Sequence, residues 1–449
     1  MKRGVFGSKL GLILATAGSA VGLGNVWRFP YLIGENGGGA FLLIYLGCIF
    51  LLGIPAVLGE FIVGRHGKSN AAASYRKITG KRYGAFVGAL GVITSTIILG
   101  FYSVVAGWCL QYLFTAATGH LHGTREMVVE AFNDFSTQPY LPIFWGLVII
   151  LLTHFIIVRG VQKGIEQASK IMMPVLLVLL IILVIVSCSL PNSFAGVRFL
   201  LMPDFTHVTH GTFLAALGQA FFSLSLGTAC LCTYASYFRK DVNLLKSASQ
   251  IAFLDTVIAV LAGLIIFPAA FSVGVNPDSG PSLVFVTLPC IFQKLFVGFP
   301  IIGLLLSVLF YLLLVLAALT STISMHEIGT AFFHEELHLS RRVAAIIETL
   351  LALTICILCS LSVGMNQLQV MGLSLLNACD KLTAQILLPI GAMLTCIIVG
   401  WMIPRHIIKD ELTNYGNLSS KYVPFLIFAI RYICPLAILI IFLHQIDLV

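Results

Sequence analysis

Long apolar stretches separated by short polar segments run along almost the whole of this 449-residue chain. Most stretches approach or exceed the roughly 20 residues that an α-helix needs to cross a bilayer. They lack the alternation of a membrane β-strand, so the pattern predicts an all-α polytopic membrane protein with eleven transmembrane helices. The predicted spans lie at 8–33, 39–64, 84–117, 141–158, 166–190, 210–237, 245–271, 299–333, 342–362, 370–401 and 424–444.

The first apolar segment is interrupted where a spanning helix should be most apolar. It reads LGLILATAGSAVGLGNVWRF from Leu10 to Phe29. Glycine weakens a helix interior by about 1 kcal/mol relative to alanine. Unpaired backbone groups at membrane depth cost several kcal/mol unless they face protein or a wet cavity. The sequence therefore predicts a broken helix whose freed carbonyls and amides bind a small ion or a zwitterion.

The sixth apolar segment, from Gly218 to Phe238, is interrupted in the same way. Its small and polar residues are Ser223, Ser225, Gly227 and Thr228. Two broken helices five segments apart predict inverted repeats over about 8–190 and 210–401, with an extra helix at 424–444, in one domain spanning 1–449. They also predict a transport site near the bilayer midplane. The alternative is that these small residues serve only close helix packing.

The eighth segment carries a cluster of hydroxyl groups within LAALTSTIS, from Leu316 to Ser324. Hydroxyls in an apolar helix commonly bond back to the preceding turn. Several together can instead face a hard cation, which prefers oxygen ligands.

Composition and charge agree with a membrane protein and exclude an ordinary soluble domain. The chain is 59% hydrophobic and 10% charged, with a mean hydropathy of +1.01. Lys and Arg gather at the amino terminus and in every second loop, which predicts a cytoplasmic amino terminus and an outside carboxyl terminus. The net charge of +8 then faces anionic lipid and requires no nucleic acid. The eleven cysteines lack metal-binding spacing and are interpreted as small core residues.

Four stretches closely resemble the neurotransmitter:sodium symporter family, and in particular its bacterial eleven-span amino-acid transporters. They are GSAVGLGNVWRFPYLIGENGGGAFLLIY (Gly18–Tyr45), GIPAVLGEFIVGR (Gly53–Arg65), TYASYFRKD (Thr233–Asp241) and ALTSTIS. The resemblance implies a 5+5 inverted-repeat fold and sodium-coupled import of a neutral, hydrophobic amino acid by alternating access. It further implies no enzymatic activity, a place in the bacterial cytoplasmic (inner) membrane, and a monomer or weak dimer.

The same resemblance implies two Na⁺ sites. Site 1 comprises Ala20, Asn25, Ser223 and Asp255, together with the substrate carboxylate, and site 2 comprises Gly18, Val21, Ala317, Thr320 and Ser321. Asp255 stands where the family usually has asparagine, and Ala259 stands where animal members use a serine to bind chloride. We expect Asp255 to supply the negative charge itself, so that no chloride is needed. The plainer alternative is that Asp255 pairs with a cationic side chain.

The resemblance also implies a substrate pocket and two gates. The pocket comprises Ala20, Gly22, Leu23, Gly24, Ile98, Tyr102, Phe222, Ser223, Ser225, Thr228, Ser321 and Met325. Arg28 and Asp380 match the outer gate, with Tyr102 and Phe222 as its aromatic lid, and Arg3 and Glu335 match the inner gate. Ala229 departs from the family pattern at the sixth-segment break and makes the local backbone there uncertain.

Further positions leave alternatives open. Gly164 and Pro174 match a motif that lets the fifth helix unwind, although a proline near a helix end is also simply tolerated. We expect Glu60 and Glu327 to join a buried polar network near the broken first helix.

One short motif and two rival functions compete with the symporter interpretation. The stretch HEELH, from His334 to His338, satisfies the zinc-protease pattern, but its place at the end of a predicted span argues against a metal site. A sodium-gated sensor or a sodium channel on the same fold is the main alternative function.

Overall fold

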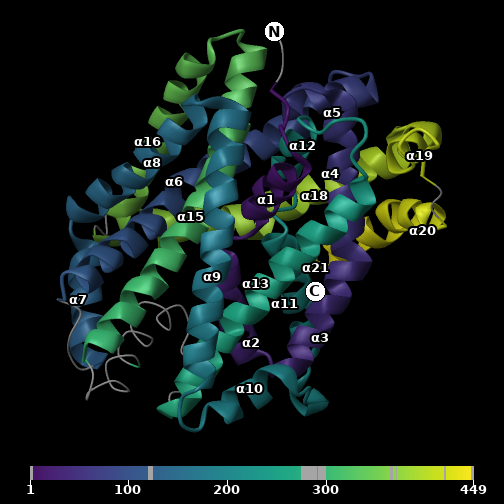
Figure 1. Ribbon diagram of the computed structural model, residues 1–449. Coiled ribbons are helices and arrows are strands. Elements are labelled where there is room, and N and C mark those ends of the chain that lie inside the picture. Colours follow the sequence, from purple (N-terminus) through teal and green to yellow (C-terminus); the bar gives the residue numbers. More distant parts are fainter. Residues whose placement is uncertain are drawn as a thin grey trace.

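The computed structural model describes residues 4–119, 125–274, 291, 300–364, 368–370, 372–418 and 421–445. Within these residues the chain is almost entirely helical (Figure 1). In the part of the chain that the structure describes, nine helices are long and apolar enough to cross a membrane, or ten when one bent pair is counted as a single span.

Over the described ranges the elements are short and long helices and one small hairpin. In chain order they are α1 (Lys9–Ala20), η1 (Gly24–Arg28), α2 (Phe29–Glu35), α3 (Gly39–Cys48), η2 (Ile49–Gly53), α4 (Ile54–Gly67), α5 (Ala71–Thr79), α6 (Gly84–Ala117), α7 (Arg125–Thr137), α8 (Leu141–Val158), η3 (Val161–Glu166), α9 (Gln167–Cys188), α10 (Ser193–Leu201), η4 (Phe205–His207), α11 (His210–Ser223), α12 (Cys230–Ala235), α13 (Leu244–Ser272), α15 (Pro300–Glu336), α16 (Arg341–Gly364), β1 (Gln369–Val370), β2 (Leu373–Ser374), α17 (Leu375–Lys381), η7 (Leu382–Leu387), α18 (Leu388–Ile397), η8 (Ile398–Met402), α19 (Arg405–Leu412), α20 (Val423–Phe428), η9 (Ala429–Ile433) and α21 (Cys434–Gln445).

The predicted break in the first helix is confirmed. The helix α1 ends at Ala20, Val21 is extended with φ −73° and ψ 116°, and the chain resumes at Gly24 with a bend of 53°. The short π-helical turn η1 is followed directly by α2. The break therefore exposes backbone groups in the middle of the span, as the glycine-rich sequence predicted.

The sixth predicted span is also broken, which explains why the structure does not reproduce the count of eleven. Its two pieces, α11 and α12, have 14 and 6 residues, so neither alone has the length of a span. Between them the backbone turns through left-handed conformations at Ser225 (φ 53°), Gly227 (φ 83°) and Ala229 (φ 60°). The departure at Ala229 is thus accommodated by a conformation that costs a non-glycine residue energy.

Glu60 of α4 stabilises this unwound segment. Its Oε1 accepts a hydrogen bond from the Gly227 backbone N–H at 2.8 Å, and its Oε2 accepts one from the Cys232 N–H at 3.2 Å. The side chain is 1% exposed, so it satisfies amides that water cannot reach. These hydrogen-bond partners belong to the broken sixth segment, which contacts the first helix through the Ser225 hydroxyl and the Ser19 carbonyl at 3.1 Å.

Two predicted span boundaries differ from the structure. The sequence predicts a tenth span from 370, but Gln369–Val370 pairs antiparallel with Leu373–Ser374, and the helix begins only at Leu375. It predicts a fifth span from 166, but that span begins at Val161 with the wide turn η3.

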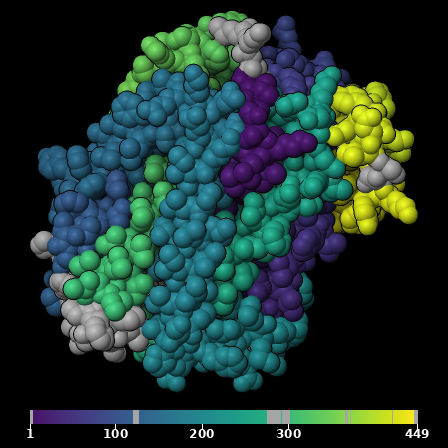
Figure 2. Space-filling model, in the orientation of Figure 1, coloured from purple at the N-terminus to yellow at the C-terminus, as the bar shows by residue number. Residues whose placement is uncertain are grey.

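The long helix α6 packs against α15, α16 and α8, and α1 packs against α9, α13 and α15 (Figure 1). Close approach of α4 to α12 depends on Gly64, where a Cβ would lie 2.0 Å from the Cys232 carbonyl oxygen. The outward face of α9 carries exposed apolar side chains such as Ile171, Val178 and Ile185, and it forms much of the surface in Figure 2. Such a continuous apolar surface suits contact with lipid.

Candidate functional site at the two helix breaks

The first polar cluster joins the two breaks to the middle of α13. The Asn25 amide nitrogen donates to Asp255 Oδ1 at 2.7 Å and to Ser223 Oγ at 3.1 Å. The Ser223 hydroxyl in turn donates to Asp255 Oδ2 at 2.6 Å. Asn25 and Asp255 are 0% exposed and Ser223 is 2% exposed. Three of the four residues predicted for Na⁺ site 1 are therefore in direct contact.

The orientation of Asn25 differs from the one expected for an oxygen ligand. Its amide nitrogen faces Asp255, and its Oδ1 accepts a hydrogen bond from the Gly22 N–H at 3.0 Å. The oxygen thus stabilises the unwound backbone of the first helix. The carboxyl group of Asp255 accepts hydrogen bonds from Asn25, Ser223 and Tyr45.

Tyr45 belongs to the same cluster, although the sequence predicts no role for it. Its hydroxyl donates to Asp255 Oδ2 at 3.3 Å, and its side chain is fully buried. Tyr45 closes the glycine-rich motif that begins at Gly18, so the sequence indicates the motif but not the direction of this side chain. That direction depends on how α3 packs against α11.

A second oxygen cluster lies between the break in the first helix and α15. The hydroxyls of Thr320 and Ser321 both donate to the Val21 carbonyl oxygen, at 3.0 and 3.2 Å. Thr320 also donates to the Ala317 carbonyl at 2.8 Å. Gly18 faces this cluster, since a Cβ there would lie 3.5 Å from Thr320 Cβ. The structure thus brings together all five residues predicted for Na⁺ site 2.

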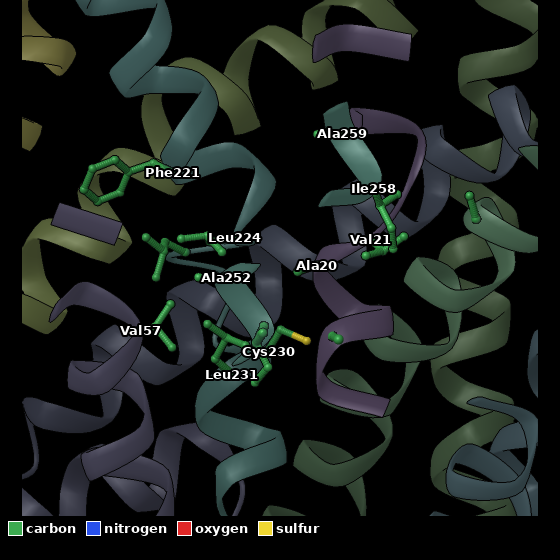
Figure 3. Close-up of a cluster of buried hydrophobic side chains, with 14 of the residues drawn as sticks. Ala20, Val21, Val57, Phe221, Leu224, Cys230, Leu231, Ala252, Ile258 and Ala259 are labelled. Carbon is green, nitrogen blue, oxygen red and sulfur yellow. The ribbon is translucent and has the colours of Figure 1, made fainter. Parts of the chain in front are cut away.

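Both clusters have the chemistry that a hard monovalent cation requires. The donor atoms are carbonyl, hydroxyl and carboxylate oxygens, which such cations prefer. The same segments also carry buried apolar side chains, and Figure 3 shows Ala20 and Val21 of the first helix, Leu224 and Cys230 of the sixth segment, and Ile258 of α13. An apolar setting strengthens the attraction between a cation and the oxygens.

Residues predicted for the substrate pocket meet between the two breaks. The Leu23 N–H donates to the Tyr102 hydroxyl at 2.9 Å. A Cβ at Gly22 would lie 2.4 Å from Ser321 Oγ, and one at Gly24 would lie 2.9 Å from the Phe222 ring. The two glycines therefore allow these side chains to approach the main chain of the first helix.

The polar side chains of the sixth segment are largely engaged by backbone. Ser225 Oγ donates to the Ser19 carbonyl at 3.1 Å, and Thr228 Oγ1 donates to the Ser225 carbonyl at 2.7 Å. Ser95 of α6, which was not predicted, donates to the Thr228 carbonyl at 2.8 Å.

The remaining predicted pocket residues lie close by. Met325 is buried, Ile98 packs beside it in the same apolar cluster, and Ala20 ends α1 at the first break.

The outer-gate residues are arranged around an aromatic contact. The Arg28 guanidinium lies over the Phe222 ring, 4.3 Å from its centroid, in cation–π geometry. Asp380 is exposed, and among the described residues it makes no direct ion pair with Arg28. A small cleft lined by Arg28, Phe222 and Leu388 opens beside this contact.

At the predicted inner gate, Glu335 accepts hydrogen bonds from the Asn70 N–H at 2.6 Å and from Ser69 Oγ at 3.0 Å. Its predicted partner Arg3 lies outside the described residues. Phe6 is 3% exposed and packs edge-on against Tyr234 and Tyr237. The amino-terminal segment is thereby anchored beside α12.

Two further acidic residues anchor this end of the bundle. Glu166, which precedes α9 and was not predicted, accepts hydrogen bonds from the Gly7 N–H at 2.6 Å and Ser8 Oγ at 2.8 Å. Glu166 lies two positions after Gly164 in the π-helical turn η3. The contact with the amino-terminal segment is therefore made from within the stretch between Gly164 and Pro174. Glu327 pairs with Arg341 at 2.5 Å and with the Tyr237 hydroxyl at 2.7 Å, and the Tyr237 ring packs against Phe6 in the segment before α1.

The HEELH motif is not arranged as a metal site. The helix α15 ends at Glu336, and His338 lies beyond it with φ 53°. His334 Nδ1 contacts the Leu339 carbonyl oxygen at 2.6 Å. The two imidazoles are therefore not held one turn apart on a helix face, and no group of three metal-binding side chains occurs among the described residues.

Comparison with known proteins places the chain in a family. The profile of the sodium:neurotransmitter symporter family matches residues 3–134 and 136–448. The chain belongs to this family. It is 39% identical over 444 residues to an uncharacterized sodium-dependent transporter, YhdH, of Bacillus subtilis, covering 98% of this chain and 97% of that one. An uncharacterized sodium-dependent transporter of Haemophilus influenzae is 33% identical, with 99% of this chain and 98% of the relative covered.

A solved structure agrees with this assignment. The crystal structure of MhsT in complex with L-phenylalanine matches with a TM-score of 0.89 and 42% identity, covering 99% of this chain and 100% of that one. The chain is thus a multi-pass membrane protein and a sodium-dependent transporter of this family. It has the same fold as MhsT.

Proposed function

We propose that this protein imports a neutral, hydrophobic amino acid together with two Na⁺ ions, by alternating access and without chloride. The observation that carries the proposal is the meeting of two oxygen clusters at one pair of broken helices. One cluster contains a carboxylate and the other consists of hydroxyls and carbonyls. Between them lie the Leu23 amide and the Tyr102 hydroxyl, which are suited to a substrate carboxylate.

In this proposal, Asn25, Ser223 and Asp255 form site 1 with the Ala20 carbonyl and the substrate carboxylate. Because the substrate carboxylate would itself coordinate the Na⁺ ion at site 1, Na⁺ and substrate would each raise the affinity of the other by the same factor. Site 2 uses Val21, Thr320 and Ser321 with Gly18 and Ala317. Because Thr320 and Ser321 lie on α15 and Val21 lies at the break, an ion there would hold the first helix against α15.

The lack of a chloride requirement follows from Asp255. Its carboxylate is fully buried, and Ala259, one turn further along α13, has no hydroxyl to offer an anion. A fixed negative charge at this position supplies what chloride would otherwise contribute to balancing Na⁺.

The gates follow from the same geometry. Arg28, stacked over Phe222, would close one side of the pocket, and Tyr102 would form the aromatic lid together with Phe222. Arg3 and Glu335 would close the other side. We propose that the amino terminus faces the cytoplasm of a bacterial cell, with the protein in its inner membrane, because Lys and Arg gather on that side.

The test is uptake by the purified full-length chain in liposomes. L-Phenylalanine, the ligand in the MhsT complex, is the first probe, and a thermal-shift screen of the other neutral amino acids in Na⁺ supplies further ones. We expect saturable accumulation against a gradient in Na⁺, loss of uptake in K⁺, and unchanged uptake when gluconate replaces chloride. A large loss in gluconate would contradict chloride independence.

The same assay separates the proposal from its alternative. A channel does not saturate or accumulate substrate against a gradient, and a sodium-gated sensor binds ligand without uptake. Ligand stabilisation in Na⁺ without transport would favour the sensor.

A further inference from the structure

A second buried carboxyl group lies away from the helix breaks, in α16. Glu348 is 0% exposed in the interior of this span. Its Oε1 accepts a hydrogen bond from Thr96 Oγ1 of α6 at 3.0 Å. Its Oε2 is buried and has no hydrogen-bond partner among the described residues. A buried polar atom without a partner requires an explanation.

The structure makes room for this carboxyl at the contact between α15 and α16. A Cβ on Gly329 would lie 2.1 Å from Glu348 Oε2 and 2.2 Å from its Cδ. Any larger residue at 329 would therefore collide with the carboxyl group. The missing side chain at Gly329 is what allows Glu348 to lie between the two helices.

Among the residues with described side chains, the helices packed around Glu348 provide no cation that forms an ion pair with it. Over its 34 residues α6 contains no Asp, Glu, Lys, Arg or His, and α8 contains only His154. On α15 the nearby groups are His326 and Glu327, and Glu327 is paired with Arg341 of α16 itself. The other charged groups with described side chains on these helices and on α7 and α17 are His334, Glu335, Glu336, Arg342, Glu130, Asp134, Asp380 and Lys381. Within this part of the chain, none of them forms an ion pair or a hydrogen bond with Glu348.

The two nearby histidines are satisfied without a positive charge. His154 Nδ1 lies 2.8 Å from Thr349 Oγ1, and His326 Nε2 lies 2.9 Å from the same hydroxyl. A hydroxyl can donate one hydrogen bond and accept another, so two neutral imidazoles complete this chain. His326 Nδ1 completes it further with Thr330 Oγ1 at 3.0 Å. These contacts do not require a charged imidazole, and neither histidine is a hydrogen-bond partner of Glu348 Oε2.

We propose that Glu348 is a proton-binding site, occupied in the closed conformation, which exchanges its proton with water when the interface of α6, α15 and α16 opens. An isolated carboxylate in a dry interior is far costlier than a carboxylic acid. Two of these three helices carry residues of the proposed transport site: Tyr102 lies six positions after Thr96 on α6, and Ser321 lies eight positions before Gly329 on α15. Ligand binding at those residues stabilises the closed interface and so retains the proton.

The first test is infrared difference spectroscopy of the purified full-length chain in lipid. We expect the wild type to show a carboxylic-acid carbonyl band near neutral pH that is lost in Glu348→Gln. The matched control Glu130→Gln, at an exposed position, should keep the band. Thr96→Val should shift its frequency without removing it, because it deletes only the hydrogen bond to Oε1. A band identical in wild type and Glu348→Gln, together with no shift in Thr96→Val, would overturn the proton site.

The second test follows exchange of the proton and needs no transport activity. On transfer into D₂O, we expect the Glu348 band to shift more slowly in Na⁺ than in K⁺, because Na⁺ stabilises the closed conformation. Equal rates in the two salts would overturn the link to the transport site. This part rests on the proposed sodium sites, but uptake of an amino acid is not involved. A failed uptake assay with a Na⁺-dependent exchange rate would therefore refute only the symport proposal.

Discussion

The Ser223 hydroxyl donates a hydrogen bond to Asp255 Oδ2 across 2.6 Å and so connects the end of α11 to the middle of α13. Asn25 holds the other oxygen of the same carboxylate at 2.7 Å. Two broken helices and one continuous helix thus meet at a single buried carboxyl group. This arrangement makes the charge of Asp255 the most direct target for testing cation binding.

Replacing Asp255 by Asn should weaken Na⁺ binding by tenfold or more. The substitution keeps the size of the side chain and removes the charge, and a loss of about 1.4 kcal/mol corresponds to tenfold in affinity. Na⁺ titration of thermal stability measures the effect. Ala259→Ser, one turn along α13, is the control and should leave the midpoint of the titration in place. An unchanged midpoint in Asp255→Asn would exclude a role for this carboxylate in binding Na⁺.

The hydroxyl of Thr320 should matter for Na⁺, and that of Thr322 on the same helix should not. Thr320→Val removes the group that contacts the Val21 carbonyl, whereas Thr322→Val removes one that contacts Thr153 Oγ1 at 2.9 Å. Both changes keep the shape of the side chain. We expect Thr320→Val to raise the Na⁺ concentration needed for half-maximal stabilisation several-fold relative to Thr322→Val. Equal midpoints would show that the second oxygen cluster is only structural.

Adding one methyl group should have opposite consequences at two glycines of the same span. At Gly64 a Cβ would lie 2.0 Å from the Cys232 carbonyl, whereas at Gly47 it would meet nothing within 4 Å. Overpacking costs about 1–3 kcal/mol, so Gly64→Ala should lower the melting temperature. Gly47→Ala should be neutral or stabilising by up to about 1 kcal/mol through helix propensity. A thermal melt of the two variants decides the matter, and equal melting temperatures would contradict the close approach of α4 to α12.

Acid should destabilise the protein through Glu411, which lies in α19 outside the predicted and observed spans. Burial raises the pKa of Glu411, but contacts from His66, Arg65 and Tyr415 outweigh it and hold the pKa below its usual value. A depressed pKa stabilises the fold above the unfolded value, about 4.3, and this contribution is lost as pH falls through the lower folded pKa. Stability should therefore fall as pH drops below about 4.

Glu411→Gln should flatten that acid limb. It should also destabilise the protein at neutral pH by about 3–5 kcal/mol, because it leaves Arg65 buried without its partner at 2.5 Å. Melting temperatures from neutral to acid pH test both effects. The neighbouring Asp410 makes none of these contacts, so Asp410→Asn should keep the wild-type dependence of melting temperature on pH. An acid limb unchanged in Glu411→Gln would assign the pH dependence to other groups.

Much of the site could be predicted because its local sequence is unusual for a membrane span. The glycines around Val21 and the small residues around Ser225 disfavour helix wherever they occur, so both breaks were visible in the sequence. Asn25, Asp255 and Thr320 are polar residues in apolar segments, and the cost of burying them indicated a function.

The sequence did not indicate interactions whose two partners lie far apart along the chain. Tyr45 reaches Asp255 across 210 positions, and Glu60 caps amides near Gly227 across 167 positions. Glu60 is a charged residue in an apolar span and Tyr45 is not, but no local pattern states which helix either side chain faces. Glu348 is visible as a charge in a span, but the lack of a partner for its Oε2 among the described residues depends on α6, α8 and α15 together.

The sequence by itself determined the membrane class, most of the spans and the two breaks, because hydropathy and glycine content act over single segments. Only the tertiary structure decided which oxygens meet, since helix packing sets the direction of each side chain. The Val21 carbonyl faces the hydroxyl of Thr320, 299 positions away, because α1 packs against α15. The same packing excludes water from these oxygens, and the attraction between a cation and the oxygens is stronger without water.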